Sequence, residues 1–325
     1  MQTILLTGGA GFIGSHLTEA LLAGGGYNII CLDSFDDFYP VAIKQQNIRR
    51  FAGHPRFSLL TMDIAFSTVQ ELRAALQGKP VDIIIHLAAK AGVRPSIEHP
   101  LAYYQTNVLG TLNLLELARQ TGVQRFIFAS SSSVYGNNAH MPWKETEQGL
   151  RPISPYASSK IAAEELGQVY AHLHNITFTA LRFFTVYGPA QRPDLAIHKF
   201  YNQIRHNEEI SLYGDGSTSR DYTYVSDIVQ GVLKSMAWKE APPFSAINIG
   251  SGRPVTLLEL VHTLEEAMDV TARIRFMDEQ PGDVKHTYAD ISAAQCLLHY
   301  APSVSLREGV ASFLQWKESP GAFDY

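Results

Sequence analysis

Cysteine is scarce in this chain, with Cys31 and Cys296 its two examples among 325 residues. Two thiols are too few for a disulfide scaffold, and Cys31 lies in an apolar run that predicts a buried core thiol. The longest apolar runs fall short of the ~18 residues of a membrane helix, and the chain does not start with a signal peptide's basic segment. Long Lys/Arg runs are missing and the net charge is −5. We therefore expect a cytoplasmic protein with no nucleic-acid and no membrane partner.

Metal-ligand patterns are absent as well. No Cys/His cluster has the spacing of a metal site, so we predict no metal. His86 stands in the apolar run 83–87, where a hydrogen-bonded core histidine is the more common role.

What the chain does have is an ordinary globular composition, 46% hydrophobic and 18% charged, with enough length for about two domains. Short apolar runs alternate with helical patterns, which predicts a doubly wound parallel α/β sheet. We expect strands at Thr3–Thr7, Asn28–Asp33, Phe57–Thr61, Asp82–Ala88, Arg125–Ser130, Thr177–Phe183 and Ala246–Ile249, and helices at Phe12–Ala23, Thr68–Leu76, Ala102–Thr121 and Pro155–His174. Residues 1–184, with returning segments near 225–250, would form the larger domain. Residues 185–325 would mainly form a smaller, interleaved α/β domain.

A glycine pattern, Gly8-x-x-Gly11-x-x-Gly14, follows the first expected strand directly and opens the first helix. Glycines there allow a tight turn and a close approach to a pyrophosphate. On its own the pattern also suits an ordinary turn. Asp33, at the end of the second strand, has the position of an acid that binds the adenosine ribose, and it favours NAD over NADP. Asp63 ends the third strand, as an adenine contact or as a solvated acid.

Tyr156 and Lys160 are spaced to share one helix face, just after the expected strand that ends in the serine run 130–133. A tyrosine with its ordinary pKa near ~10 is a poor base at neutral pH. A neighbouring ammonium can lower that pKa by stabilising the phenolate, and a serine hydroxyl can hold the oxygen being oxidised. The alternative is an unrelated Tyr and Lys on a solvent-facing helix.

Together, the glycine pattern and Tyr156-x-x-x-Lys160 resemble the extended short-chain dehydrogenase/reductase family of nucleotide-sugar enzymes, along essentially the whole chain. The resemblance implies a Rossmann-type fold, bound NAD, and Ser131, Tyr156 and Lys160 as catalytic residues. It also implies a homodimer formed through the helices 102–121 and 155–174. The implied cofactor site consists of Gly8, Gly11, Phe12, Ile13, Gly14, Asp33, Asp63, Ile64, Leu87, Ala88, Ala89, Asn107, Tyr156 and Lys160.

Several reactions in that family begin alike, with removal of the sugar's 4-hydroxyl proton and transfer of hydride from carbon 4. Dehydratases of the family need an Asp-Glu pair where this chain has Ser132 and Ser133, which disfavours dehydration. Epimerases need no extra group, because the 4-keto sugar rotates and takes the hydride back on its other face.

The segments 33–39, 91–94 and 182–194 resemble the UDP-glucuronate 4-epimerase branch. Arg192 would offer a bidentate partner for a uronic acid carboxylate and Thr185 a hydroxyl, although Arg192 could instead pair with Asp194. The expected substrate residues are Arg94, Ser132, Ser133, Thr185, Arg192, Arg220 and Asp283. Arg94 has a structural alternative, and Arg220 could pair with Asp221.

We therefore expect NAD-dependent 4-epimerisation of a UDP-sugar, with UDP-glucuronate and UDP-galacturonate as the favoured pair. The alternatives are 4-epimerisation of UDP-glucose or UDP-N-acetylglucosamine, UDP-glucuronate decarboxylation, and a non-catalytic NAD-binding sensor.

Overall fold

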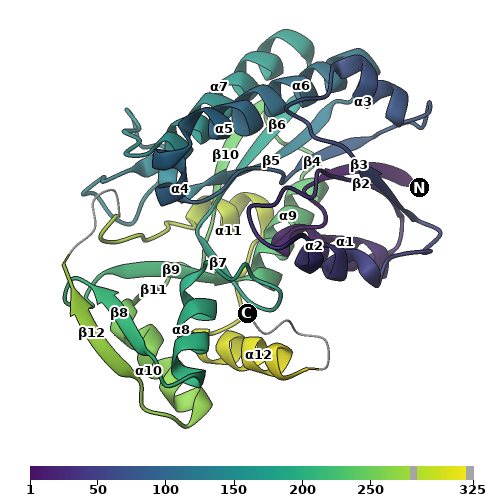
Figure 1. Cartoon of the computed structure of the whole chain (residues 1–325). Helices are drawn as coiled ribbons and strands as arrows, with labels where there is room; N and C mark the ends of the chain where they lie inside the picture. Colours follow the sequence, from purple (N-terminus) through teal and green to yellow (C-terminus); the bar gives the residue numbers. More distant parts are fainter. Residues whose placement is uncertain (279–283, 320–325) are drawn as a thin grey trace.

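Seven parallel strands form the central sheet in the order β10-β6-β5-β4-β1-β2-β3 (Figure 1). The structure, a computed structural model, describes residues 1–278 and 284–319. The strands are β1 (Gln2–Thr7), β2 (Tyr27–Asp33), β3 (Phe57–Thr61), β4 (Ile83–His86), β5 (Arg125–Ser131), β6 (Thr177–Phe183) and β10 (Phe244–Ile249). Most are apolar nearly throughout, as strands covered on both faces must be. This order confirms the predicted doubly wound α/β fold.

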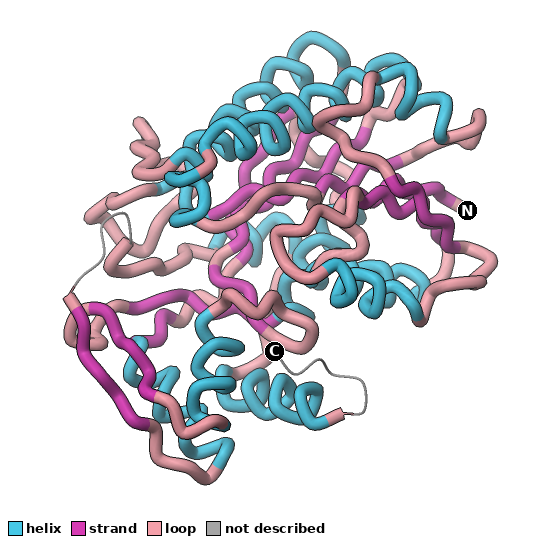
Figure 2. Tube along the Cα trace, viewed as in Figure 1, coloured by secondary structure: helices cyan, strands magenta, loops and turns pink. Residues whose placement is uncertain are grey.

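Helices cover both faces of the sheet, above and below the strands in Figure 2. On one face, Leu6 and its neighbours pack with α1 (Phe12–Gly24), α2 (Val41–Arg49), α9 (Val225–Ala237) and α11 (Ser292–Leu298). On the other, Leu5 and its neighbours pack with α3 (Val69–Ala75), α6 (Gly110–Thr121) and α7 (Pro155–His174). Alternate residues of one strand thus serve two cores. Cys31 is fully buried, as expected.

Most expected elements lie within two residues of the observed bounds, and two of the differences have a structural cause. The expected helix 102–121 consists of α5 (Pro100–Tyr104), a π-helical turn (Gln105–Leu109) and α6, because the N–H of Gly110 bonds five residues back to Gln105. The expected strand 82–88 ends at His86, and the next residues leave the sheet. A short helix, α4 (Val93–Glu98), follows.

The lower part of Figure 1 is built on two small sheets. One has the order β11-β9-β7, with β7 (Thr185–Tyr187), β9 (Ser219–Tyr224) and β11 (Pro254–Thr256); the other pairs β8 (Glu209–Tyr213) with β12 (Arg273–Met277). They share a hydrophobic core with α8 (Ala196–Arg205), α10 (Leu257–Met268) and α12 (Leu306–Glu318). In sequence, α9, β10 and α11 interrupt this part, since all three pack on the central sheet. Among the described helices, none has the length and apolar character needed to cross a bilayer.

A buried ion pair joins α7 to the sheet. The Arg182 guanidinium on β6 donates from Nε and Nη2 to the Glu164 carboxylate at 3.0 and 2.7 Å. Their side chains are 6% and 5% exposed. Ser130 on β5 also donates to Glu164, and Arg182 donates to the Tyr135 hydroxyl at 3.0 Å. The pair therefore fixes α7 against the ends of β5 and β6.

Replacing Arg182 by Met should destabilise the protein by about 3–5 kcal/mol, because it leaves the Glu164 charge buried without its partner. Urea denaturation followed by circular dichroism measures the change. Arg119→Met is the matched control, since its pair with Glu116 is exposed and should contribute little. Equal midpoints for the two variants would contradict the assigned role of the buried pair.

Candidate active site

A tight glycine turn joins β1 to α1. Gly8 has φ +71°, and a Cβ there would lie 2.7 Å from the backbone nitrogen of Ala88. A Cβ on Gly14 would lie 2.2 Å from the Gly8 carbonyl oxygen. Both positions therefore require glycine. Because no side chain caps the start of α1, its first N–H groups are available to an anion such as a pyrophosphate.

The turn opens onto a cavity of about 480 Å³, called here the larger cavity. Asp33 lines it and is 6% exposed; its carboxylate accepts the N–H groups of Ala10 at 3.1 Å and Phe35 at 2.9 Å. Asp63, also on the wall, accepts the N–H of Ala65 at 2.8 Å. The other predicted cofactor residues on the wall are Gly8, Gly11, Phe12, Ile13, Gly14, Ile64, Leu87, Ala88, Ala89, Tyr156 and Lys160. The closely packed glycine turn, the uncapped helix and the acid at the end of β2 fit NAD.

Asn107 differs from its expected role. It is 1% exposed and is not among the residues that line the larger cavity. Its amide group instead bonds both backbone groups of Lys90, at 2.8 and 3.0 Å, and donates to the Ser159 hydroxyl at 2.9 Å. Asn107 therefore positions the cavity wall after β4. His86 takes the expected core role, with ring contacts to Thr7 and Thr111.

The three predicted catalytic residues meet on the wall of the larger cavity. Tyr156 and Lys160 share one face of α7, which begins where Ser154 caps the N–H of Ala157 and Pro155 occupies the first turn. Ser131 ends β5, and its side chain lies near enough to Tyr156 to lower the pKa of the phenol. The hydroxyls of Ser131 and Tyr156 and the amine of Lys160 thus belong to the wall of one cavity.

The electrostatics of Tyr156 differ from the sequence-based expectation. Burial raises the pKa of Tyr156, whereas the Ser131 hydrogen bond and the Arg192 charge lower it. The Lys160 ammonium donates to the Ala129 carbonyl at 2.7 Å. Burial lowers the pKa of Lys160 to about 7, and the nearby Glu164 carboxylate acts in the opposite direction. In this geometry burial outweighs the groups that favour the phenolate, so the pKa of Tyr156 is raised.

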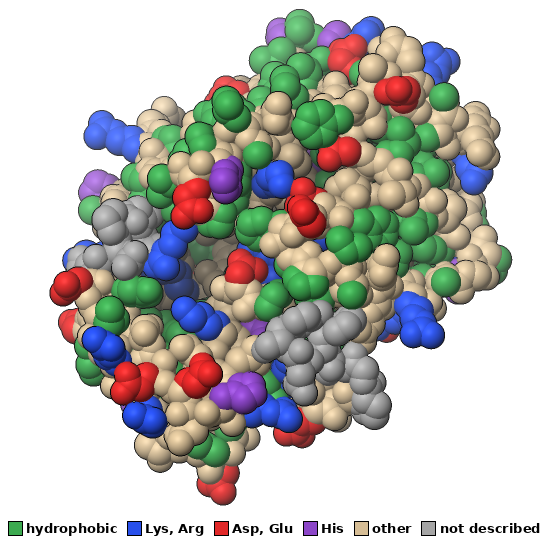
Figure 3. Space-filling view, viewed as in Figure 1, with side chains coloured by type: hydrophobic (Ala, Val, Ile, Leu, Met, Phe, Trp, Pro, Cys, Tyr) green, Lys and Arg blue, Asp and Glu red, His purple; other side chains and the backbone are tan. Residues whose placement is uncertain are grey.

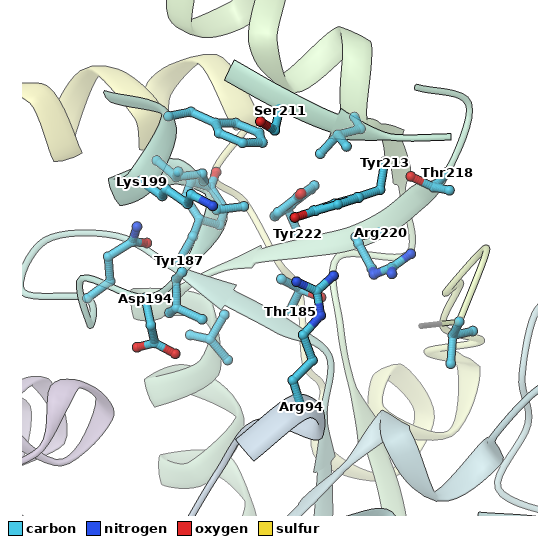
Figure 4. Close-up of a pocket in the computed structure, with 18 of the residues that line it drawn as sticks. Arg94, Thr185, Tyr187, Asp194, Lys199, Ser211, Tyr213, Thr218, Arg220 and Tyr222 are labelled. Atoms are coloured by element: carbon cyan, nitrogen blue, oxygen red, sulfur yellow. The ribbon is translucent and has the colours of Figure 1, made fainter. Parts of the chain in front are cut away.

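A second cavity of about 350 Å³, the smaller cavity, lies against the small sheets (Figure 4). Thr185, Val186 and Leu195 line both cavities. The cations on the wall of the smaller cavity are Arg94, Lys199, Arg220 and Lys285. Figure 3 shows Lys and Arg side chains beside a hollow in this region. The arrangement suits a polyanion such as a nucleoside diphosphate.

The predicted substrate residues divide between the two cavities. Arg94 and Arg220 line the smaller one, and Ser132, Ser133 and Arg192 the larger. Arg94 reaches from α4 to within 5.0 Å of the Tyr213 ring centre.

Two of these arginines have partners that bear on their roles. The Arg220 guanidinium donates to the carbonyls of Ser219 and Lys285. Asp221 is instead bonded to neighbouring N–H and hydroxyl groups. Arg192 does pair with Asp194, the alternative left open above. Asp283 lies outside the described residues.

Several cavity residues were not singled out from the sequence. Lys90 and Asp36 form an ion pair of 2.7 Å on the wall of the larger cavity, between the segments after β4 and β2. Lys199, Tyr213 and Lys285 line the smaller cavity from three distant segments. The segment 33–39 was noted for its family likeness, but no local spacing marks the other residues.

Comparisons with known proteins identify the family of this chain. The model of the "NAD dependent epimerase/dehydratase family" matches residues 4–250. The chain belongs to this family. It is 36% identical to a UDP-glucuronate 4-epimerase of Thermodesulfobacterium geofontis over 319 residues, 98% of this chain and 97% of the relative.

Solved structures are similar over almost the whole chain. One is a UDP-glucuronic acid 4-epimerase from Bacillus cereus in complex with UDP-glucuronic acid and NAD, with TM-score 0.90, 36% identity, and 97% and 98% of the two chains covered. Another is a UDP-glucose 4-epimerase from Thermotoga maritima with UDP-glucose, with TM-score 0.87, 32% identity and the same coverage. These likenesses confirm the predicted family and fold.

Replacing Gly14 by Ala should reduce NAD affinity by at least about tenfold, ~1.4 kcal/mol, because the new methyl group collides with the Gly8 carbonyl. Fluorescence titration of the cofactor-stripped protein measures it. Gly24→Ala, at the other end of α1, is the control, since nothing lies within 4 Å of its Cβ. Unchanged NAD affinity in Gly14→Ala would contradict the assignment of the turn.

Proposed function

We propose that this protein is an NAD-dependent 4-epimerase that interconverts UDP-glucuronate and UDP-galacturonate. The observation that carries the proposal is that Ser131, Tyr156 and Lys160 share the larger cavity with Thr185, which also lines the smaller cavity. A sugar at that point would reach the catalytic groups while its nucleotide occupied the cation-lined cavity. The epimerases of Thermodesulfobacterium geofontis and Bacillus cereus support this choice of substrate.

In this proposal Tyr156 takes the proton of the sugar's 4-hydroxyl and later returns it. The Ser131 hydroxyl acts on Tyr156 from the end of β5, so it can hold the reacting oxygen beside the base. NAD, when bound, supplies the hydride acceptor and donor at carbon 4. Lys160, buried at 3% exposure, contributes a positive charge beneath the site that favours the phenolate when its amine is protonated.

The walls also support epimerisation over competing outcomes. Ser132 and Ser133 stand where an eliminating enzyme of this family would carry an acid pair, and hydroxyls cannot transfer the protons of dehydration. Hydroxyls can instead hold a sugar carboxylate, together with Thr185. A carboxylate held in place and ionised would resist loss of carbon dioxide from the 4-keto intermediate, which is a β-keto acid.

The nucleotide end of the substrate would lie in the smaller cavity. Arg94, Arg220, Lys199 and Lys285 surround it with positive charge, which the diphosphate requires. The Tyr213 ring and the apolar walls of the same cavity offer contact surface to the uridine.

Incubation of the purified protein with UDP-glucuronate, with products separated by ion-exchange chromatography, tests the proposal. UDP-galacturonate should accumulate, and Tyr156→Phe should slow its formation by about 10²–10⁴-fold, because the proton acceptor is gone. Tyr104→Phe is the control, since its hydroxyl contacts Ser158 and the residue lines neither cavity.

UDP-glucose and UDP-N-acetylglucosamine are run in parallel. The pairing of Arg192 with Asp194 and the likeness to the Thermotoga maritima UDP-glucose epimerase favour a neutral sugar as the second candidate. Turnover of neutral sugars alone would overturn the uronate assignment, and a UDP-pentose product would indicate decarboxylation.

We also propose a homodimer. The exposed apolar side chains Leu101, Leu109 and Leu173 lie on α5, the adjoining π-helical turn and α7, and α5 packs beside α7. Exposed apolar side chains on neighbouring helices are typical of an interface. The expectation of a cytoplasmic protein stays a prediction.

The double change Leu109→Glu and Leu173→Glu should give a monomer by multi-angle light scattering, because it places charge in the apolar interface. Phe66→Glu, 72% exposed but in the segment between β3 and α3, should leave the dimer intact. A double variant that remains a dimer would place the interface elsewhere.

A further inference from the structure

One acidic residue stands on the wall of the smaller cavity among four cations. Of the residues that the structure describes there, Asp194 alone carries a carboxylate. Figure 4 shows it on the opposite side of the cavity from Thr218 and Arg220. A carboxylate is out of place in a cavity for an anionic nucleotide sugar, because like charges repel.

The Asp194 carboxylate forms an ion pair with the Arg192 guanidinium. The arginine donates from Nε to Oδ1 of Asp194 at 2.9 Å and from Nη2 to Oδ2 at 2.8 Å, a two-pronged contact. Arg192 faces the larger cavity and Asp194 the smaller, so the pair stands at the boundary between the two. The Asp194 side chain thus uses the two guanidinium N–H groups that a substrate carboxylate would need.

Arg192 is held by its surroundings, whereas the Asp194 side chain is accessible to water. The guanidinium lies 5.2 Å from the centre of the Phe38 ring, and its side chain is 17% exposed. The Asp194 side chain is 44% exposed, so water can take over its hydrogen bonds if it turns away. The charge of Arg192 also acts on the Tyr156 hydroxyl, which places the guanidinium near the reacting centre.

We propose that Asp194 is a resident counter-ion of Arg192 that the carboxylate of a uronic acid sugar displaces. The inference rests on the proposed function, because it assigns a role to the uronate group of that substrate. The exchange replaces one carboxylate on the guanidinium by another, so Arg192 is never left without a partner. A neutral hydroxymethyl group cannot make this exchange, so Arg192 favours acidic over neutral UDP-sugars and Asp194, as its competitor, reduces that preference.

Removing the competitor should strengthen uronate binding. Asp194→Asn keeps the shape of the side chain but weakens its hold on Arg192. The Kd for UDP-glucuronate, measured by calorimetry on the NAD-loaded protein, should fall about fivefold. The Kd values for UDP-glucose and for UDP should change by less than about twofold, since neither presents a carboxylate.

Two further variants separate exchange from general repulsion. In an Arg192→Met background, Asp194→Asn should no longer affect the Kd for UDP-glucuronate, because the group competed for is absent. Glu209→Gln removes the acid of a pair with Arg273, away from both cavities, and should leave all three Kd values at the wild-type level. Melting temperatures confirm that each variant is folded.

Each contrary outcome is decisive. An unchanged or raised Kd for UDP-glucuronate in Asp194→Asn overturns the exchange, and a raised one would make Asp194 a clamp on Arg192. Equal tightening for UDP-glucose, or tightening that persists without Arg192, would reduce Asp194 to a repelling charge. Binding needs no turnover, so these outcomes stand apart from the product assay that tests the proposed function.

Discussion

The buried ion pair of Glu164 and Arg182 is the interaction on which the placement of the proposed catalytic groups depends. Glu164 lies one helical turn beyond Lys160, so α7 cannot slide or rotate without breaking a two-pronged contact to β6. The same carboxylate accepts a hydrogen bond from Ser130, beside the proposed catalytic serine. One pair thus holds the strand end and the helix in register. Charges this deeply buried are stable only when matched, so the arrangement tolerates little distortion.

Local sequence patterns were sufficient for most of the fold. The strand Thr177–Phe183 and the helix Pro155–His174 have the expected bounds, because an apolar run and a Ser-Pro start are signals read over neighbouring residues. The sequence does not reveal the π-helical turn within 102–121, since that turn spans five residues and apolar periodicity is read over longer windows. The expected strand 82–88 is longer than β4 because residues 87 and 88 are apolar for a different reason: they line the larger cavity.

The candidate site also has a part that the sequence predicts and a part that it does not. The glycine turn, Asp33 and the Tyr156–Lys160 spacing are visible in short segments and meet at one cavity. Contacts between distant segments have no such signature, so Lys199 and Lys285 were missed. The pKa of Tyr156 depends on the depth of burial, which spacing cannot reveal. Whether Arg192 pairs with its neighbour or with a ligand is likewise a property of the folded loop.

The passage from β6 into β7 has a mechanical consequence. The chain crosses from the large sheet to a small one through Phe184 alone, which is 4% exposed and whose N–H bonds to the Ile249 carbonyl at 3.1 Å. A wide, hinge-like opening of the two halves would break that contact and expose an aromatic ring. The β6–β7 connection is therefore rigid. During epimerisation the sugar itself would have to turn within the cavity, while the two parts of the protein keep their places.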